Sequence, residues 1–375
     1  MRNNIFISVI LNMIEAMGPT MTEQESGTVT VASSYRRNTK RKIAFIVFCL
    51  LLSMIAAVYS ATLGSYPITA QEVYSTVWNV LIGNGDSLDP TIRHVVIDLR
   101  LPRIIAGFLC GLGLAISGVA MQSMLKNPLA DPYTMGISTG ASLGASLAII
   151  FGIELFNAGI VANAFVFACV PALVILFLSK FKGATPLVMI LVGVALNYLF
   201  SAIVQMVRLL ADPDGLSDLF RWSVGNLDGV TYEHSILILV FCIIGMFYFQ
   251  YVSNQLNIMG LGDETAKTMG VDVERKRLIC ILLVTLVAAG IVSFTGVIGF
   301  IGLVAPHIVR IIIGSDVKYL VPAAGAFGAL LLLCSDIVAR VVVAPTILPV
   351  GVVTSFIGGP LFLLLILHNS KEEWA

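Results

Sequence analysis

Residues 101–124 read LPRIIAGFLCGLGLAISGVAMQSM, and this stretch decides the fold class. Beyond Arg103 it carries no charged residue. A bilayer core about 30 Å thick is crossed by roughly 20 helical residues, so the stretch is long enough to span a membrane. It therefore predicts a transmembrane helix.

Nine further apolar stretches have the same character. Together the ten occupy approximately residues 43–63, 101–124, 133–152, 159–179, 186–208, 235–252, 278–296, 299–313, 319–340 and 350–368. The eighth is short and the third and tenth are rich in glycine, so their ends are the least defined. The sequence thus predicts an all-α polytopic membrane protein of about ten transmembrane helices, with one transmembrane domain over residues 43–370.

The composition excludes other classes of protein. The chain is 58% hydrophobic and 12% charged with a mean hydropathy of +0.95, whereas soluble domains are about 45–50% apolar and about 25% charged. Its 22 basic and 22 acidic residues cancel, and no long basic tract is present to bind nucleic acid. The six cysteines lie singly in different apolar stretches, which favours packing over a disulfide or zinc site.

The distribution of basic residues predicts the orientation. An even number of spans places both termini on one side, and the basic run over residues 36–42 predicts that this side is the cytoplasm. All nine lysines and seven of the thirteen arginines then lie inside. Residues 1–42 are expected to form a disordered cytoplasmic extension. The apolar run at 5–17 is too short to span, so either a signal peptide or a later start at Met13, Met17 or Met21 remains open.

The six cations on the predicted outer side are all arginines: Arg93, Arg100, Arg103, Arg208, Arg221 and Arg340. A guanidinium group binds a carboxylate through two parallel hydrogen bonds, which lysine cannot do. Each of them could instead extend from a helix end to the membrane surface. Taken together, they predict docking of an acidic partner.

The predicted spans contain almost no ionisable groups, which an ion-coupled transporter needs at mid-membrane depth. Asp336 and Arg340 lie one helical turn apart, close to a span end, and are expected to pair. The chain has no Walker A, G-x-S-x-G or H-E-x-x-H motif, so we expect no catalysis in this chain. His307, beside Pro306, is expected to have a structural role at a helix break. An ion-coupled transporter and a non-transporting membrane subunit are the alternatives.

Small and polar residues recur at helical spacing within three spans. Gly107 and Gly111, and likewise Gly136, Gly140 and Gly144, form faces on which helices can approach closely. One polar stripe, on the fifth span, consists of Asn197, Ser201 and Gln205. This stripe either hydrogen-bonds a neighbouring helix or lines a wet pathway.

The longest inner loop, residues 254–277, contains a helix signal. Gly262 is suited to cap it, Asp263 and Glu264 favour its first turn, and Gly270 terminates it. Leu261, Ala266 and Met269 would give this helix a small apolar face. So short a helix needs packing support from the bundle or from a partner. An ordinary loop is the other interpretation.

Several segments together resemble the FecCD-type permeases, the membrane subunits of ABC importers for iron-siderophores, haem and vitamin B12. The first is LRLPR at 99–103, followed by GLGLAISG at 111–118, MQ at 121–122 and NPLADP at 127–132. The C-terminal segments are FTGVIGFIGLVAPH at 294–307 and LPVG at 348–351. The resemblance covers roughly residues 40–370.

This resemblance implies a type II ABC importer permease with both termini in the cytoplasm of a prokaryotic plasma membrane. The implied cargo is an iron complex, first a ferric siderophore, with cobalamin or haem as alternatives. The implied partners are a second permease copy or close paralogue, two ATP-binding subunits that carry ATP and Mg, and an extracytoplasmic substrate-binding protein. No cofactor is expected in this chain.

The resemblance also implies roles for particular residues. Docking of the binding protein would fall to Arg100, Arg103 and Arg340. Coupling to the ATPase would fall to Leu261, Gly262, Asp263, Ala266, Met269 and Gly270, where Met269 replaces the leucine common in the family. Asn197, Ser201 and Gln205 would line the translocation pathway.

Overall fold

The computed structural model describes residues 31–369 except 65, 67, 85–87 and 158. The predicted disorder of residues 1–42 falls largely outside these residues, although residues 31–42 belong to the first described helix. The helices in chain order are α2 (Val31–Thr62), α3 (Ala70–Leu81), α4 (Pro90–Arg93), η2 (His94–Arg100), α5 (Leu101–Leu125), η3 (Pro132–Met135), α6 (Ile137–Phe151), η4 (Leu155–Asn157), α7 (Gly159–Lys182), α8 (Pro186–Leu209), α9 (Pro213–Ser223), α10 (Tyr232–Tyr251), α11 (Ser253–Gly260), α12 (Asp263–Thr268), α13 (Val273–Thr295), α14 (Ile301–Ile313), α15 (Val317–Val341) and α16 (Val350–Asn369).

The all-helical prediction is confirmed for the described part of the chain. Nine of the ten predicted stretches each coincide with one helix over most of their length, whereas the third, 133–152, is divided between η3 and α6. Seven of these helices are long and apolar enough to cross a membrane. The shorter apolar helices are α6, α14 and α16, the three whose ends were least defined in the sequence.

The second span begins earlier than the sequence indicates. We expected it to start at residue 101, but α4, the π-helical η2 and α5 run continuously from Pro90 to Leu125. Proline lacks an N–H and crowds the carbonyl four residues before it. The wider π-helical turn before Pro102 accommodates both effects, so the helix continues through this point.

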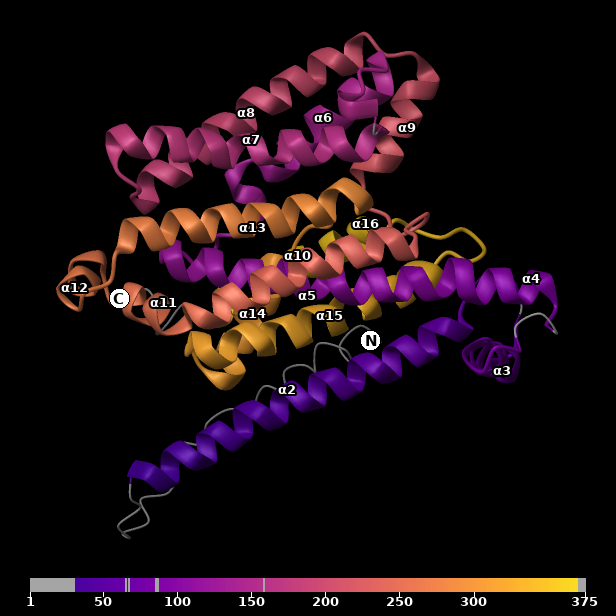
Figure 1. The fold of residues 1–375 in the computed structure, drawn as a ribbon, viewed down its shortest axis with the longest axis horizontal. Helices are drawn as coiled ribbons and strands as arrows, with labels where there is room; N and C mark the ends of the chain where they lie inside the picture. Colours follow the sequence, from indigo (N-terminus) through magenta and orange to yellow (C-terminus); the bar gives the residue numbers. More distant parts are fainter. Residues whose placement is uncertain (1–30, 65, 67, 85–87, 158, 370–375) are drawn as a thin grey trace.

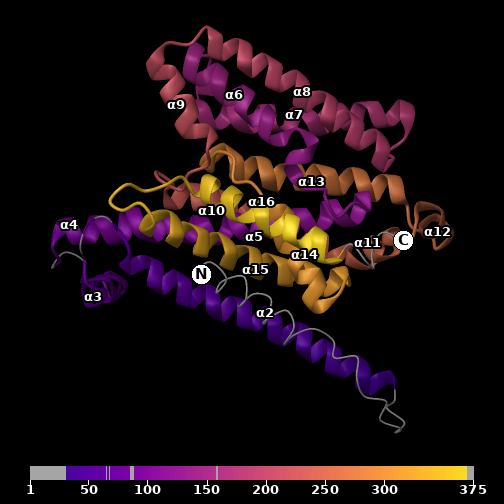
Figure 2. The ribbon, with the colours of Figure 1, turned by 180° about the vertical axis from the view of Figure 1, so that it is seen from behind.

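Helix α5 is the central helix of the bundle and packs against α15, α10, α14 and α13 (Figure 1). In the most apolar 18-residue segment of the helix that contains α5, 83% of the residues are buried. The corresponding segment of α8 has 22% of its residues buried. Helices α6–α9 form a group on one side of α13, and α2 lies along the opposite flank, as both views show (Figures 1 and 2). The short helices α11 and α12 lie at one end of the bundle, and α3 and α4 lie at the other.

Close backbone contacts between glycines hold α5 in this position. A Cβ atom on Gly118 would lie 1.8 Å from the carbonyl oxygen of Gly302 in α14. A Cβ atom on Gly111 would lie 2.3 Å from the carbonyl oxygen of Gly328 in α15. On the other side of α13, Gly144 approaches α7 in the same way. Of the predicted small-residue faces, Gly111, Gly140 and Gly144 therefore serve tight helix packing, whereas Gly136 precedes α6 with a φ of 87° and lies on no helix face.

Candidate functional site

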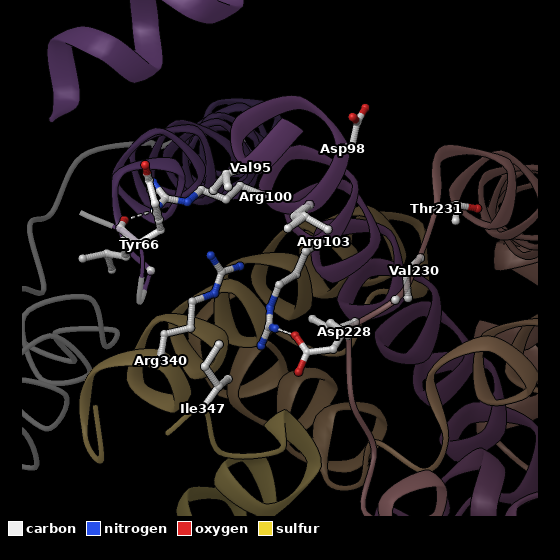
Figure 3. A pocket seen from close by; sticks show the side chains of 15 residues that line it. Tyr66, Val95, Asp98, Arg100, Arg103, Asp228, Val230, Thr231, Arg340 and Ile347 are labelled. Carbon is white, nitrogen blue, oxygen red and sulfur yellow. Dashed lines mark hydrogen bonds and ion pairs between the residues drawn. The ribbon is translucent and has the colours of Figure 1, made fainter. Parts of the chain in front are cut away.

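A cavity of about 440 Å³ opens at the end of the bundle that carries α3 and α4, here called the α4 end (Figure 3). Its walls come from the loop after α2, from η2 and the start of α5, from the loop between α9 and α10, and from the end of α15. Arg100, Arg103 and Arg340 all line this cavity. The structure thus brings together three arginines that the sequence separates by up to 240 positions.

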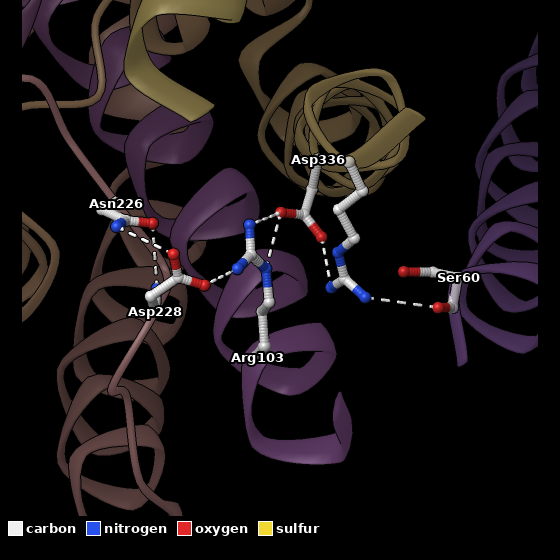
Figure 4. Close-up of polar contacts among 6 residues, drawn as sticks. Ser60, Arg103, Asn226, Asp228 and Asp336 are labelled. Atoms are coloured by element: carbon white, nitrogen blue, oxygen red, sulfur yellow. Dashed lines mark hydrogen bonds and ion pairs between the residues drawn. The ribbon is translucent and has the colours of Figure 1, made fainter. Parts of the chain in front are cut away.

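Two of these arginines share one buried carboxylate (Figure 4). Nε and Nη2 of Arg103 donate to Oδ1 of Asp336 at 2.9 and 2.7 Å. Nη2 of Arg340 donates to Oδ2 of Asp336 at 2.5 Å, and its Nη1 donates to the carbonyl oxygen of Ser60 at 3.3 Å. The predicted Asp336–Arg340 pair is confirmed, and it belongs to a larger network that joins α2, α5 and α15.

A second carboxylate neutralises Arg103 from the cavity side. Asp228, on the loop between α9 and α10, forms an ion pair with Nη1 of Arg103. The side-chain amide of Asn226 donates to the other Asp228 oxygen at 3.0 Å and so holds this carboxylate in place. Arg103 is therefore engaged by two acids, and its guanidinium group is almost fully buried.

Arg100 differs from the other two because its donors meet only backbone oxygens. Nη1 donates to Ala61 at 2.9 Å and Nη2 donates to Tyr66 at 2.8 Å. A side chain at Gly64 would come within 2.8 Å of Nη2, so the loop closes tightly around the guanidinium group. Within the described residues no ion pair joins Arg100 to a carboxylate. It therefore lines the cavity without an acidic partner of its own among these residues, although Asp98 lines the same cavity.

The remaining predicted outer arginines do not line this cavity. Arg93 and Arg221 are exposed, and Arg208 is half-buried at the end of α8. The three arginines that line the cavity are the three that the family resemblance implied for docking, whereas nothing in the sequence pointed to Asp228. A loop aspartate carries no local signal for its partner, which lies 125 positions earlier in the chain.

The helix predicted in the long inner loop is present as α12, at the opposite end of the bundle, here called the α12 end. Gly262 caps it with a φ of 128°, Asp263 and Glu264 occupy its first turn, and Gly270 follows it with a φ of 82°. The preceding residues form a further short helix, α11, that the sequence did not indicate. The alternative of an ordinary loop is therefore wrong.

The apolar residues of this segment face in two directions. Leu261 is 70% exposed and Met269 is 57% exposed, whereas Ala266 is fully buried in the core. The predicted common apolar face of all three is therefore wrong, because α12 must bury one side against the bundle to be stable at its length. Ala266 serves that packing, and the two larger side chains remain exposed.

An arginine that sequence analysis overlooked secures α12. Arg277 in α13 is 1% exposed and donates from Nη2 to both oxygens of Asp263, at 2.9 and 3.1 Å. It also donates to the carbonyl oxygens of Met124 in α5 and Ala184 before α8. Lys126 adds a 2.6 Å ion pair to Asp263. Burial alone would raise the pKa of Asp263, but these donors outweigh it and the net pKa is lowered.

The two interpretations of the polar stripe on α8 apply to different residues. Asn197 accepts from Thr139 in α6 at 2.8 Å and donates to the Thr134 carbonyl oxygen at 3.1 Å, so it joins neighbouring helices. Ser201 and Gln205 are exposed on the surface of the single chain. They remain accessible to a pathway or to a second subunit.

The expectation for His307 needs correction. Helix α14 continues through Pro306 from Ile301 to Ile313, so this residue is not at a helix break. The ring of His307 lies edge-on to Phe362 in α16, with 5.9 Å between the ring centroids. The contact joins α14 to α16 and is consistent with a packing role.

A bundle of apolar helices, seven of them long enough to cross a bilayer among the described residues, defines a multi-pass membrane protein. A cavity lies at one end of this bundle, and the exposed side chains of Leu261 and Met269 lie at the other. Residues 50–368 match the model of the FecCD transport family, and the chain belongs to this family of ABC transporter permease subunits.

Three similar proteins illustrate the relationship. A Methanocaldococcus jannaschii protein described as an ABC transporter permease is 40% identical over 353 residues, which cover 91% of this chain and 99% of that one. The hemin transport system permease HmuU of Yersinia pestis is 36% identical over 334 residues, covering 87% and 96%. A solved structure described as an inward-facing metal-chelate type ABC transporter superposes with a TM-score of 0.75 at 30% identity, covering 86% and 98%.

Proposed function

We propose that this chain is the translocating subunit of an ATP-driven importer of iron chelates in a prokaryotic plasma membrane. The observation that carries the proposal is the placement of two contact features at opposite ends of one bundle. The cavity with Arg100 would receive an acidic binding protein outside, and α12 with Leu261 and Met269 would contact an ATPase inside. Both termini would then lie in the cytoplasm.

The working assembly would contain two permeases, either two copies of this chain or this chain and a close paralogue. Two ATP-binding subunits would supply ATP and Mg, and an extracytoplasmic binding protein would supply selectivity. ATP binding would move α12 and tilt the bundle so that the pathway opens to one side at a time. The exposed Ser201 and Gln205 on α8 would line this pathway.

The cargo we propose is a ferric siderophore. The second candidate is haem, favoured by the 36% identity to the hemin permease HmuU, and both are consistent with a metal-chelate type neighbour. The test is uptake of labelled ferric siderophore, haem and cobalamin by proteoliposomes that contain the complex and its binding protein. ATP-dependent accumulation of an iron chelate supports the proposal, whereas accumulation of cobalamin alone refutes the iron cargo.

Replacement of Arg100 by alanine is expected to weaken binding of the substrate-binding protein about 30-fold, since a desolvated interfacial charge contact is worth about 2 kcal/mol or more. Surface plasmon resonance on the detergent-purified complex measures this affinity. The matched control is Arg93→Ala, which removes an exposed arginine outside the cavity. Equal losses in both variants would show that docking does not use the cavity. Arg103→Glu is a poor test because it places a second carboxylate against Asp336.

Glutamates in place of Leu261 and Met269 are expected to reduce copurification of the ATP-binding subunits about 100-fold. Burial of two such side chains against the ATP-binding subunits contributes about 3 kcal/mol or more to the free energy of binding. Glutamates at the same positions would remove this contribution. Quantitative pull-down in mild detergent measures the loss. Lys267→Glu on the same helix is the control, because Lys267 is half-exposed and pairs only distantly with Glu274. Normal copurification of the double variant would contradict the contact.

A further inference from the structure

Helix α3, between α2 and α4, is not explained by either contact feature. It begins with a capping box in which Thr69 and Glu72 satisfy each other's backbone and side-chain groups. The backbone N–H and the hydroxyl group of Thr69 each donate to the Glu72 carboxylate at 2.8 Å. These hydrogen bonds lower the pKa of Glu72, and the backbone one has the larger effect. The helix is therefore a defined element whose first turn carries a carboxylate held by two hydrogen bonds.

The surface of α3 divides lengthwise into three faces. The first face packs against the bundle and consists of Val73, Thr76, Val77 and Val80. The second is polar and exposed and consists of Gln71, Glu72 and Ser75. The third is exposed yet apolar and aromatic and consists of Tyr74, Trp78 and Leu81. The residues of each face recur at helical spacing.

The third face is a contiguous apolar patch, larger than the isolated exposed apolar side chains that are common on protein surfaces. Trp78 is 63% exposed, and Leu81 is more exposed still. Ile82 extends the same patch beyond the end of the helix. Exposed aromatic side chains in contact with water would be costly, so this face needs an apolar neighbour.

This face continues the exposed apolar surface of α2. On that helix Leu51, Met54, Ile55 and Val58 recur on one exposed side, and Tyr59 follows them. The Tyr74 hydroxyl donates to the Val58 carbonyl oxygen at 3.1 Å, which fixes α3 beside the end of this surface. Because α2 is a membrane-spanning helix of a permease, its exposed apolar side faces lipid.

We propose that α3 is an interfacial helix that lies in the headgroup region of the leaflet at the α4 end. Tyr74, Trp78 and Leu81 insert toward the acyl chains, while Glu72 and Ser75 face water. Tyrosine and tryptophan are enriched at this depth because they combine an apolar ring with a polar group. A helix with one apolar and one polar face is suited to this position. The proposal needs only the membrane-spanning bundle and is independent of cargo and docking.

The chain contains three tryptophans, which makes the depth of α3 measurable. Trp222→Phe combined with Trp374→Phe leaves Trp78 as the only tryptophan. The purified full-length chain, without its partner subunits, is reconstituted into phosphatidylcholine liposomes brominated either near the headgroup or near the chain ends. We expect Trp78 fluorescence to fall by about half with the shallow label and less with the deep one, as for an interfacial ring.

The control keeps Trp222 alone, through Trp78→Phe and Trp374→Phe. Trp222 packs against the core cluster of α6 and α13 and is expected to respond weakly to both lipids. If the double variant does not purify, the difference between wild type and Trp78→Phe gives the same signal.

Two outcomes would overturn the proposal. Strong iodide quenching without quenching by brominated lipid would place Trp78 in water. Resistance to both quenchers would show that protein, from a second copy of this chain, covers this face.

Discussion

Asp336→Leu is expected to destabilise the permease by about 3–5 kcal/mol, because it leaves two buried guanidinium groups without their shared carboxylate. Arg103 and Arg340 approach Asp336 at 2.5–2.9 Å, and Asp336 is fully buried. Desolvated like charges on α5 and α15 would then repel each other. The measurement is the thermal unfolding midpoint of the detergent-purified protein, followed by fluorescence-detected size exclusion.

A compensated variant separates charge from packing in this experiment. Leucine at residues 103, 336 and 340 together removes every charge of the trio, and an apolar replacement of a buried ion network is often neutral or stabilising. We expect this triple variant to recover most of the loss. Asp228→Asn is the second control, because Asp228 is half-exposed and its loss leaves Asp336 in place. A triple variant as unstable as Asp336→Leu would show that shape, rather than charge, dominates.

Gly118→Val is expected to abolish accumulation of folded protein. The added Cβ would lie 1.8 Å from the Gly302 carbonyl oxygen, which is backbone and cannot rotate away. Helices α5 and α14 would have to separate. Overpacking of a core typically destabilises a protein by up to about 3 kcal/mol, and we expect at least this loss here because the obstructing atom belongs to the backbone. Expression as a fluorescent fusion, with the monodisperse fraction measured by size exclusion, tests this expectation.

Gly260→Ala is the matched control for this substitution. Gly260 ends α11, is exposed, and would bring its Cβ within 4 Å of no other atom. A glycine-to-alanine change at an open helical position is neutral or slightly stabilising. Wild-type behaviour of Gly118→Val would mean that the contact between α5 and α14 is looser than the structure indicates.

The helices were predictable because their signals are local. Apolar length defined the spans, and the Gly262, Asp263 and Gly270 pattern defined α12 at its two ends. The early start of the second span was not predictable, since Pro102 normally indicates a helix start and the π-helical turn before it has no clear sequence signature. The small-residue faces were also visible in the sequence, although the helices they contact were not.

The candidate sites were predictable only in part. The arginines of the cavity and the pairing of Arg340 with Asp336 could be deduced from the sequence, but the burial of these arginines and the pairing of Arg103 with Asp336 and Asp228 could not. On either side of α12, Leu261 and Met269 are exposed as a contact with a partner requires, whereas Ala266 within α12 faces the core. Arg277 was counted only as an inner cation, yet it joins α12 to α5 and to the loop before α8.

The membrane class, the apolar helices and the family could all be deduced from the sequence. Helix formation and apolar length depend on neighbours a few positions apart. The pairing of the charges depends on the packing of the helices. Arg103 and Asp336 are 233 positions apart in the sequence, and they meet where glycines let α5 and α15 pack at backbone distance. Arg100 has no ion pair among the described residues, because the end of α2 and the loop after it place the carbonyl oxygens of Ala61 and Tyr66 at its donors.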